Sequence, residues 1–123
     1  MKLYRMMKID ADGKPTVGNG SMMLGIRPTD PTQPERRFDV PAVNETDLVR
    51  PGDGGLSCYS DAAAIKLRSR KLALCSIGSE KLGSKLRPIA TGNMHYLVEP
   101  TDEMMLGELQ QFFAETRELW QLE

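Results

Sequence analysis

Hydrophobic and polar residues alternate over several short stretches of the chain, a pattern typical of strands with one buried face. These stretches are residues 2–9, about 21–27, 56–59, 86–91 and 94–99. Pro88 lies inside the fourth stretch. Because proline has no N–H for a sheet ladder, we expect that strand at a sheet edge. The apolar run 72–77, "LALCSI", fits either a strand or the end of a helix.

Two segments carry helical signals instead. Ser60 is a good N-cap for the run "DAAAIKLRSRKL" at 61–72, whose alanines favour a helix. Thr101 likewise predicts the start of a second helix that runs to Glu123. Hydrophobic residues recur along it at helical spacing, so we expect this helix to pack on the sheet. Its apolar face holds Met105, Leu109, Phe112, Phe113, Thr116 and Trp120.

These elements predict an α+β fold in a single domain over residues 1–123, because a chain of 123 residues can bury one core. Residues 28–51 interrupt the pattern with five of the eight prolines. We expect a long proline-rich loop there. A lid or binding loop and a disordered insertion both fit this composition.

The composition limits which metal sites, disulfides and membrane segments we expect. The chain has two cysteines, Cys58 and Cys75, no CxxC pair and one histidine, so we predict reduced, buried thiols and no metal site. It has no apolar run long enough to span a membrane and no secretory leader, so we expect synthesis in the cytosol. Export of a folded protein by a leaderless secretion route stays open.

Charge is unevenly distributed although the net charge is only −1. Residues 66–87 hold seven Lys or Arg against Glu80, and residues 99–123 hold seven acids against Arg117. A basic segment of this kind attracts phosphate-bearing ligands or nucleic acid, and it is equally typical of a solvated surface. It contains no aromatic residue. We therefore do not expect nucleic acid as a partner, because single strands are usually stacked on aromatic rings.

Four dispersed features stand out, and each alone has a structural explanation. Arg5 on an apolar strand face requires a partner. Gly54 and Gly55 precede Ser57 and are compatible with a turn of positive φ. The solitary His95 and the strand-end residue Glu99 are compatible with structural roles.

Taken in order, these features resemble a known family. "LYR" near the N-terminus, "GDGGLS" in the centre, and "HYLVEP" followed by "MMLGELQQFFAETRELW" resemble small bacterial toxins delivered by type VI secretion systems, whose fold is related to mono-ADP-ribosyltransferases. The resemblance implies a split, bent β core with flanking helices and a cleft for NAD as substrate. It also implies injection into the cytoplasm of a target cell, an unidentified target molecule and a cognate immunity protein.

The same resemblance implies roles for individual residues, although the Ser-Thr-Ser form of the central motif is absent. A carboxylate at Glu99 would stabilise the positive charge that develops on ribose as nicotinamide leaves. An arginine fork and bare glycine backbone suit a pyrophosphate. About 13 Å of extended strand separates His95 from Glu99, so these two would contact different parts of the cleft. The implied catalytic residues are Ser57, His95 and Glu99, and the implied cofactor-binding residues are Tyr4, Arg5, Gly54 and Gly55.

Three functions therefore remain open at this point: an NAD-consuming or ADP-ribosyl-transferring toxin, a toxin of the same fold that binds a target without turnover, and a non-enzymatic interaction module. The last would dock a partner on the acidic C-terminal helix or on the basic segment 66–87. The NAD hypothesis requires the dispersed side chains to meet around one cavity.

Overall fold

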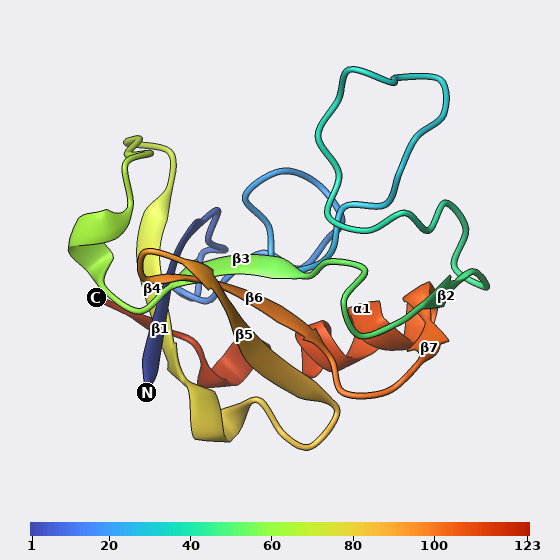
Figure 1. Cartoon of the computed structure of the whole chain (residues 1–123). Helices are drawn as coiled ribbons and strands as arrows, with labels where there is room; N and C mark the ends of the chain where they lie inside the picture. The colour runs from blue at the N-terminus through green and yellow to red at the C-terminus, as the bar shows by residue number, and fades with distance from the viewer.

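A computed structural model describes all residues 1–123. Its main feature is a six-stranded antiparallel sheet in the order β5-β6-β3-β1-β4-β8, with a second, two-stranded sheet formed by β2 and β7 (Figure 1). The strands are β1 Lys2–Met7, β2 Leu48–Val49, β3 Leu56–Tyr59, β4 Ala73–Gly78, β5 Leu86–Gly92, β6 His95–Pro100, β7 Met104–Met105 and β8 Gln121–Leu122. One helix, α1, spans Leu106–Glu115. The α+β class is confirmed.

Strand β1 lies near the centre of the large sheet, and its alternation decides which side is buried. Leu3 and Met7 are fully buried, whereas Tyr4 between them is only half-buried. Tyr4 lies opposite Tyr59 of β3 on one side and Ser76 of β4 on the other. The sheet therefore has a core face and an outer face, and the registers assign each residue of β3 and β6 to one of them.

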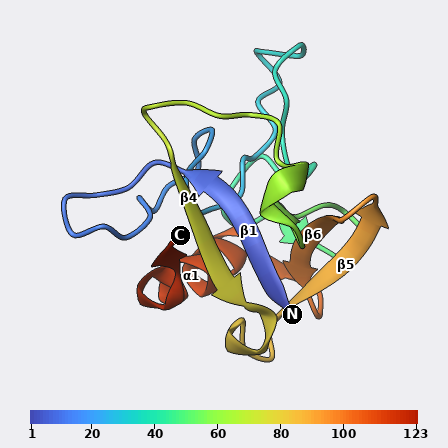
Figure 2. The same ribbon diagram turned by 90° about the vertical axis from the view of Figure 1, so that its left-hand side faces the viewer.

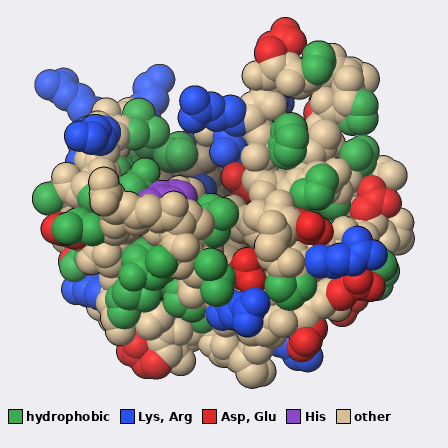
Figure 3. Space-filling model, in the orientation of Figure 1, with side chains coloured by type: hydrophobic (Ala, Val, Ile, Leu, Met, Phe, Trp, Pro, Cys, Tyr) green, Lys and Arg blue, Asp and Glu red, His purple; other side chains and the backbone are tan.

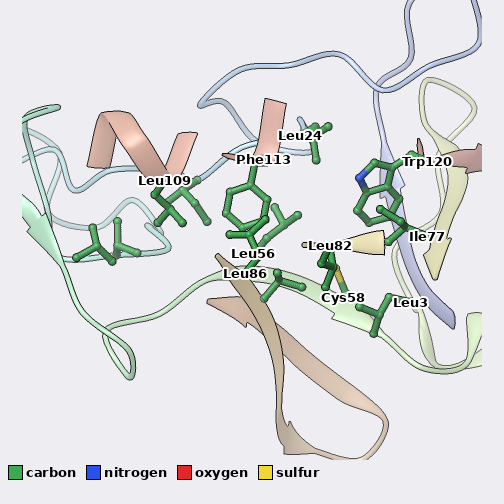
Figure 4. Close-up of a cluster of buried hydrophobic side chains, with 14 of the residues drawn as sticks. Leu3, Leu24, Leu56, Cys58, Ile77, Leu82, Leu86, Leu109, Phe113 and Trp120 are labelled. Carbon is green, nitrogen blue, oxygen red and sulfur yellow. The ribbon is translucent and has the colours of Figure 1, made fainter. Parts of the chain in front are cut away.

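The core lies between the sheet and the C-terminal segment. Leu109 and Phe113 of α1 pack with Leu56 and Cys58 of β3, and Trp120 packs near Ile77 (Figure 4). The turned view shows α1 behind β1 and β4 (Figure 2). The indole N–H of Trp120 donates to Thr116 Oγ1 at 3.1 Å, so the polar atom of this large side chain is satisfied inside the core.

The C-terminal helix was expected to begin after Thr101 and to run to the end of the chain, and both expectations were wrong. Met104 and Met105 form β7, which pairs with Val49 and Leu48, so the helix begins only at Leu106. It ends at Glu115 and is followed by a 3₁₀ turn and by β8, which pairs with β4. Met105 is 39% exposed and does not belong to the buried face.

The predicted helix 61–72 is also absent. A single 3₁₀ turn, Ala62–Ala64, is capped by Asp61 rather than Ser60, with the Asp61 carboxylate accepting from the Ala63 N–H at 2.9 Å. Among residues 61–71 only Ile65 is buried. The alanines favour a helix, but the segment has no apolar stripe to pack against the protein, and packing supplies most helical stability.

Residues 21–27 were predicted as a strand and form none; Leu24 makes only an isolated bridge to Val17. The loop 28–51 is irregular as expected, apart from the short strand β2. Residues 72–77, left open between helix and strand, lie almost entirely in β4. The edge position expected for the strand with Pro88 is confirmed, since β5 is the first strand of the sheet.

The assignment of this fold to the ADP-ribosyltransferase type stays a prediction. None of the helices combines the length and the apolar character needed to cross a membrane.

Candidate functional site

The outer face of β3 and β6 carries a hydrogen-bonded pair of side chains. Leu56 and Cys58 of β3 point to the core, so Ser57 and Tyr59 point outward. His95 of β6 is the register partner of Tyr59 and shares this outer face. Ser57 Oγ and His95 Nε2 lie 2.7 Å apart. In Figure 3 the histidine lies at the floor of a hollow whose upper rim carries Lys and Arg side chains.

A bulge in the neighbouring strand fixes the imidazole. The pairing of β5 with β6 shifts register between Ala90 and Gly92, leaving Thr91 as the extra residue, and bulges commonly redirect a side chain. Thr91 Oγ1 contacts His95 Nδ1 and also donates to the His95 carbonyl oxygen at 3.4 Å. The ring of Tyr59 meets the imidazole edge to face, with centroids 5.0 Å apart.

The contacts of Thr91 and Ser57 fit either tautomer of the neutral imidazole. The hydroxyl of Thr91 has one proton, and if that proton is donated to the carbonyl oxygen, the hydroxyl accepts from Nδ1–H. Nε2 is then the acceptor and receives the proton of the Ser57 hydroxyl. In that tautomer the basic nitrogen of His95 faces Ser57; in the other, Nε2–H donates to Ser57 Oγ.

Arg5 lies on the opposite face of the sheet and is only 7% exposed. Its Nη1 donates to the carbonyl oxygen of Ser57 at 3.0 Å and its Nη2 to that of Met23 at 3.1 Å, while its Nε has no partner. Burial lowers the pKa of Arg5 from its ordinary value. The guanidinium therefore ties β3 to the 16–24 segment from behind, and its side chain does not join Ser57 and His95 on the outer face.

Gly54 and Gly55 contact main chain rather than an open cavity. A Cβ on Gly54, whose φ is +139°, would overlap the carbonyl oxygen of Asp39, and one on Gly55 would overlap that of Val98. Glycine is needed here because two backbone segments approach too closely for any side chain. The structure therefore gives these glycines a packing role, and their pyrophosphate contact stays a prediction.

Glu99 is 6% exposed and its carboxylate is fully engaged. Oε2 accepts from Arg87 Nε at 3.1 Å and from Arg87 Nη2 at 3.0 Å, and Oε1 accepts from the Gly52 N–H at 3.1 Å. Arg87 is the cross-strand partner of Glu99 in β5. The acid thus anchors the glycine-rich turn to the sheet, and its predicted contact with ribose stays a prediction.

Tyr4 does lie on the outer face, because it is the register partner of Tyr59. Its ring is half-buried and Lys2 Nζ lies 5.7 Å from the ring centroid. Of the predicted residues, Tyr4, Ser57 and His95 lie free on the outer face. Glu99 shares that face of β6 by register, but its carboxylate is held by Arg87 and Gly52. We call Arg5, Gly54, Gly55 and Glu99, which contact other parts of the protein, the supporting layer; the seven residues do not meet around one cavity.

Two residues of the site were missed by sequence reasoning. Tyr59 follows Ser57 by two positions in the same strand, and that spacing alone places both side chains on one face. Thr91 gives no comparable signal, because its contact with His95 depends on the bulge in β5.

The thiols of Cys58 and Cys75 are free and buried, as expected, and burial raises the pKa of Cys58 to about 12. No group of three or more His, Cys, Asp or Glu side chains is arranged to hold a metal ion. Comparisons with models of protein families, with curated proteins and with solved structures found no match to this chain.

Proposed function

We propose that this protein is a toxin resembling the mono-ADP-ribosyltransferases of type VI secretion systems, and that it acts on NAD at the outer face of β3 and β6. The observation that carries the proposal is the hydrogen bond between Ser57 Oγ and His95 Nε2, 2.7 Å long, on a half-exposed surface. It joins two of the residues that the family resemblance singles out although they are far apart in the sequence.

The chemistry of the pair suits a sugar substrate. The Ser57 hydroxyl and the imidazole offer neutral hydrogen-bonding groups to ribose hydroxyls. When nicotinamide leaves, His95 Nε2 is placed to take a proton from the incoming nucleophile, a water or a hydroxyl of the target. The exposed basic residues of the β3–β4 loop, Lys66, Arg68, Arg70 and Lys71, would attract the dinucleotide phosphates.

The supporting layer has a different part in this proposal. Arg5 holds the Ser57 carbonyl oxygen, and Glu99 holds the N–H of Gly52 in the turn that leads into β3. Both are positioning residues that keep Ser57 in place against His95. Neither the guanidinium nor the carboxylate contacts substrate.

Nicotinamide release from NAD by the purified chain, followed by chromatography, tests the proposal. We expect release by the wild type, and a loss of about 100-fold or more in Ser57→Ala and in His95→Gln, which corresponds to removal of a catalytic group. Ser84→Ala, an exposed serine in the loop before β5, is the matched control and keeps wild-type release. Absence of release and of NAD binding by the wild type would overturn the proposal.

A second candidate is a toxin that binds its target without turnover, and the engagement of Glu99 by Arg87 and Gly52 favours it. In that case toxicity in cells persists without nicotinamide release, and Ser57→Ala removes toxicity while Glu99→Gln does not. In either case we propose that a cognate immunity protein covers the outer face around His95.

A further inference from the structure

A cavity of about 350 Å³ lies among the loops of residues 19–43, and no residue of the Ser57–His95 face lines it. Three of its lining residues are arginines, Arg27, Arg36 and Arg37, and a fourth is the aromatic Phe38. We propose that this cavity binds a nucleoside phosphate, with the phosphates on the arginines and the base on Phe38. This inference does not depend on the proposed function.

The three arginines differ in how free they are. Arg27 is fixed by Asp39, which accepts from Nη2 at 3.1 Å and from Nε at 3.3 Å. Arg36 makes one contact, from Nη1 to Gln33 Oε1 at 3.3 Å, and Arg37 makes no hydrogen bond or ion pair through its side chain. Two guanidinium groups therefore keep most of their donors for a ligand, and the guanidinium fork matches phosphate oxygens bidentately.

Phe38 provides the aromatic surface on which the base would stack. Its side chain is 50% exposed, which is unusual for a phenylalanine, and it lines the same cavity as its neighbours Arg36 and Arg37. An aromatic face next to cationic groups is the arrangement on which bases stack while their phosphates are neutralised. A bound base would cover the apolar surface that the free protein leaves in water.

The remaining lining selects a small polar ligand rather than an apolar one. Asp30 and Thr29 contribute a carboxylate and a hydroxyl, which suit the hydroxyl and amino donors of a nucleoside. The volume is at the lower end of the range for small-molecule sites, about 300–1,000 Å³. With Arg27 paired to Asp39, Arg36 and Arg37 against Asp30 still leave the lining positively charged.

Isothermal titration of the full chain with ADP and, separately, with inorganic pyrophosphate tests the site. We expect both to bind, and the Arg36→Ala/Arg37→Ala double variant to raise both Kd values by about tenfold or more. Phe38→Ala should raise the Kd for ADP and leave the Kd for pyrophosphate unchanged. All of these positions are exposed, so the variants should retain the melting temperature of the wild type.

A matched control makes the result decisive. Arg50→Ala removes an exposed arginine away from the cavity lining and should not change ADP binding. Because no residue of the Ser57–His95 face lines this cavity, absence of nicotinamide release by the wild type leaves the inference intact. No binding of ADP by the wild type, or equal losses in Arg50→Ala and the double variant, would overturn the inference.

Discussion

The predicted site residues of the central sheet fall into a group that the protein itself engages and a group that stays half-exposed. On the buried face, the Arg5 guanidinium donates to two carbonyl oxygens, and at the end of β6, on the outer face, the buried Glu99 carboxylate accepts three hydrogen bonds. On the outer side, Ser57 and His95 bond to each other and remain half-exposed.

The difference shows what burial does to a charged side chain. A desolvated charge requires partners, and the partners nearest to Arg5 and Glu99 are backbone groups and Arg87. Once these bonds form, the charged groups have little left to offer a ligand. The uncharged pair needs fewer partners and can stay at the surface, so the side chains that remain free for a ligand lie on the outer face.

The largest expected effect concerns the close backbone contact at Gly54 in the supporting layer. Gly54→Ala should lower the free energy of unfolding by about 3 kcal/mol or more, because the new Cβ meets the Asp39 carbonyl oxygen and the φ of +139° is strained for alanine. Urea denaturation measures it. Gly83, with φ +83° and no neighbouring atoms, is the matched control, and alanine there should cost only about 1 kcal/mol. Equal costs would refute the backbone contact.

Arg5→Met should cost about 2 kcal/mol, because it leaves the carbonyl oxygens of Ser57 and Met23 without donors while removing a desolvated charge. The stability of Arg5→Lys should fall between those of the wild type and Arg5→Met, since an ammonium lacks the fork that reaches both oxygens. Thermal and urea unfolding give the comparison. If Arg5→Met kept full stability and lost only NAD affinity, the guanidinium would be a ligand contact and its place in the supporting layer would be wrong.

Glu99→Gln should cost about 1 kcal/mol, since glutamine still accepts from the Gly52 N–H but loses the charge opposite the half-exposed Arg87. Nicotinamide release should stay within about tenfold of the wild type, because no interaction specific to the transition state is removed. Glu103→Gln, at the exposed ion pair with Arg50, is the control. A large loss of release at unchanged stability would make Glu99 catalytic after all.

The smallest effect concerns the thiol beside Arg5. Burial raises the pKa of Cys58 to about 12, so above pH 9 the unfolded chain loses this proton and the native state keeps it. Stability should therefore fall as pH rises from 9 towards 12, by less than about 1 kcal/mol at pH 9.5 from this group. Urea denaturation at pH 7.5 and 9.5 should show a smaller drop in Cys58→Ala. An identical drop would mean that the thiol is not desolvated.

Strands were the part of the fold that the sequence predicted best. The alternation in residues 2–9 and 94–99 survives as β1 and β6 because one face of each packs on the core. Residues 21–27 alternate just as clearly and form no strand. The local pattern does not show whether a partner strand is present. The alanine-rich segment 61–72 forms no helix because it has no apolar stripe to pack against the protein.

The sequence predicted which residues form the candidate site, but not which partners their side chains contact. Ser57 and His95 were named from the sequence, and the register of β3 with β6 brings them together. The face of Arg5 follows from alternation, but its carbonyl partners come from residues 18 and 52 positions away along the chain. Thr91 depends on a bulge, which is a tertiary feature with no marker in the local sequence.

Titration of the chain with NAD, with each variant checked for its melting temperature, tests the central claim most directly. The account predicts that Ser57→Ala and His95→Gln keep the wild-type melting temperature and raise the NAD Kd by about tenfold or more. Glu99→Gln should lose some stability and keep the Kd. The reverse pattern, with unchanged affinity in the outer-face variants and lost affinity in Glu99→Gln, would contradict it.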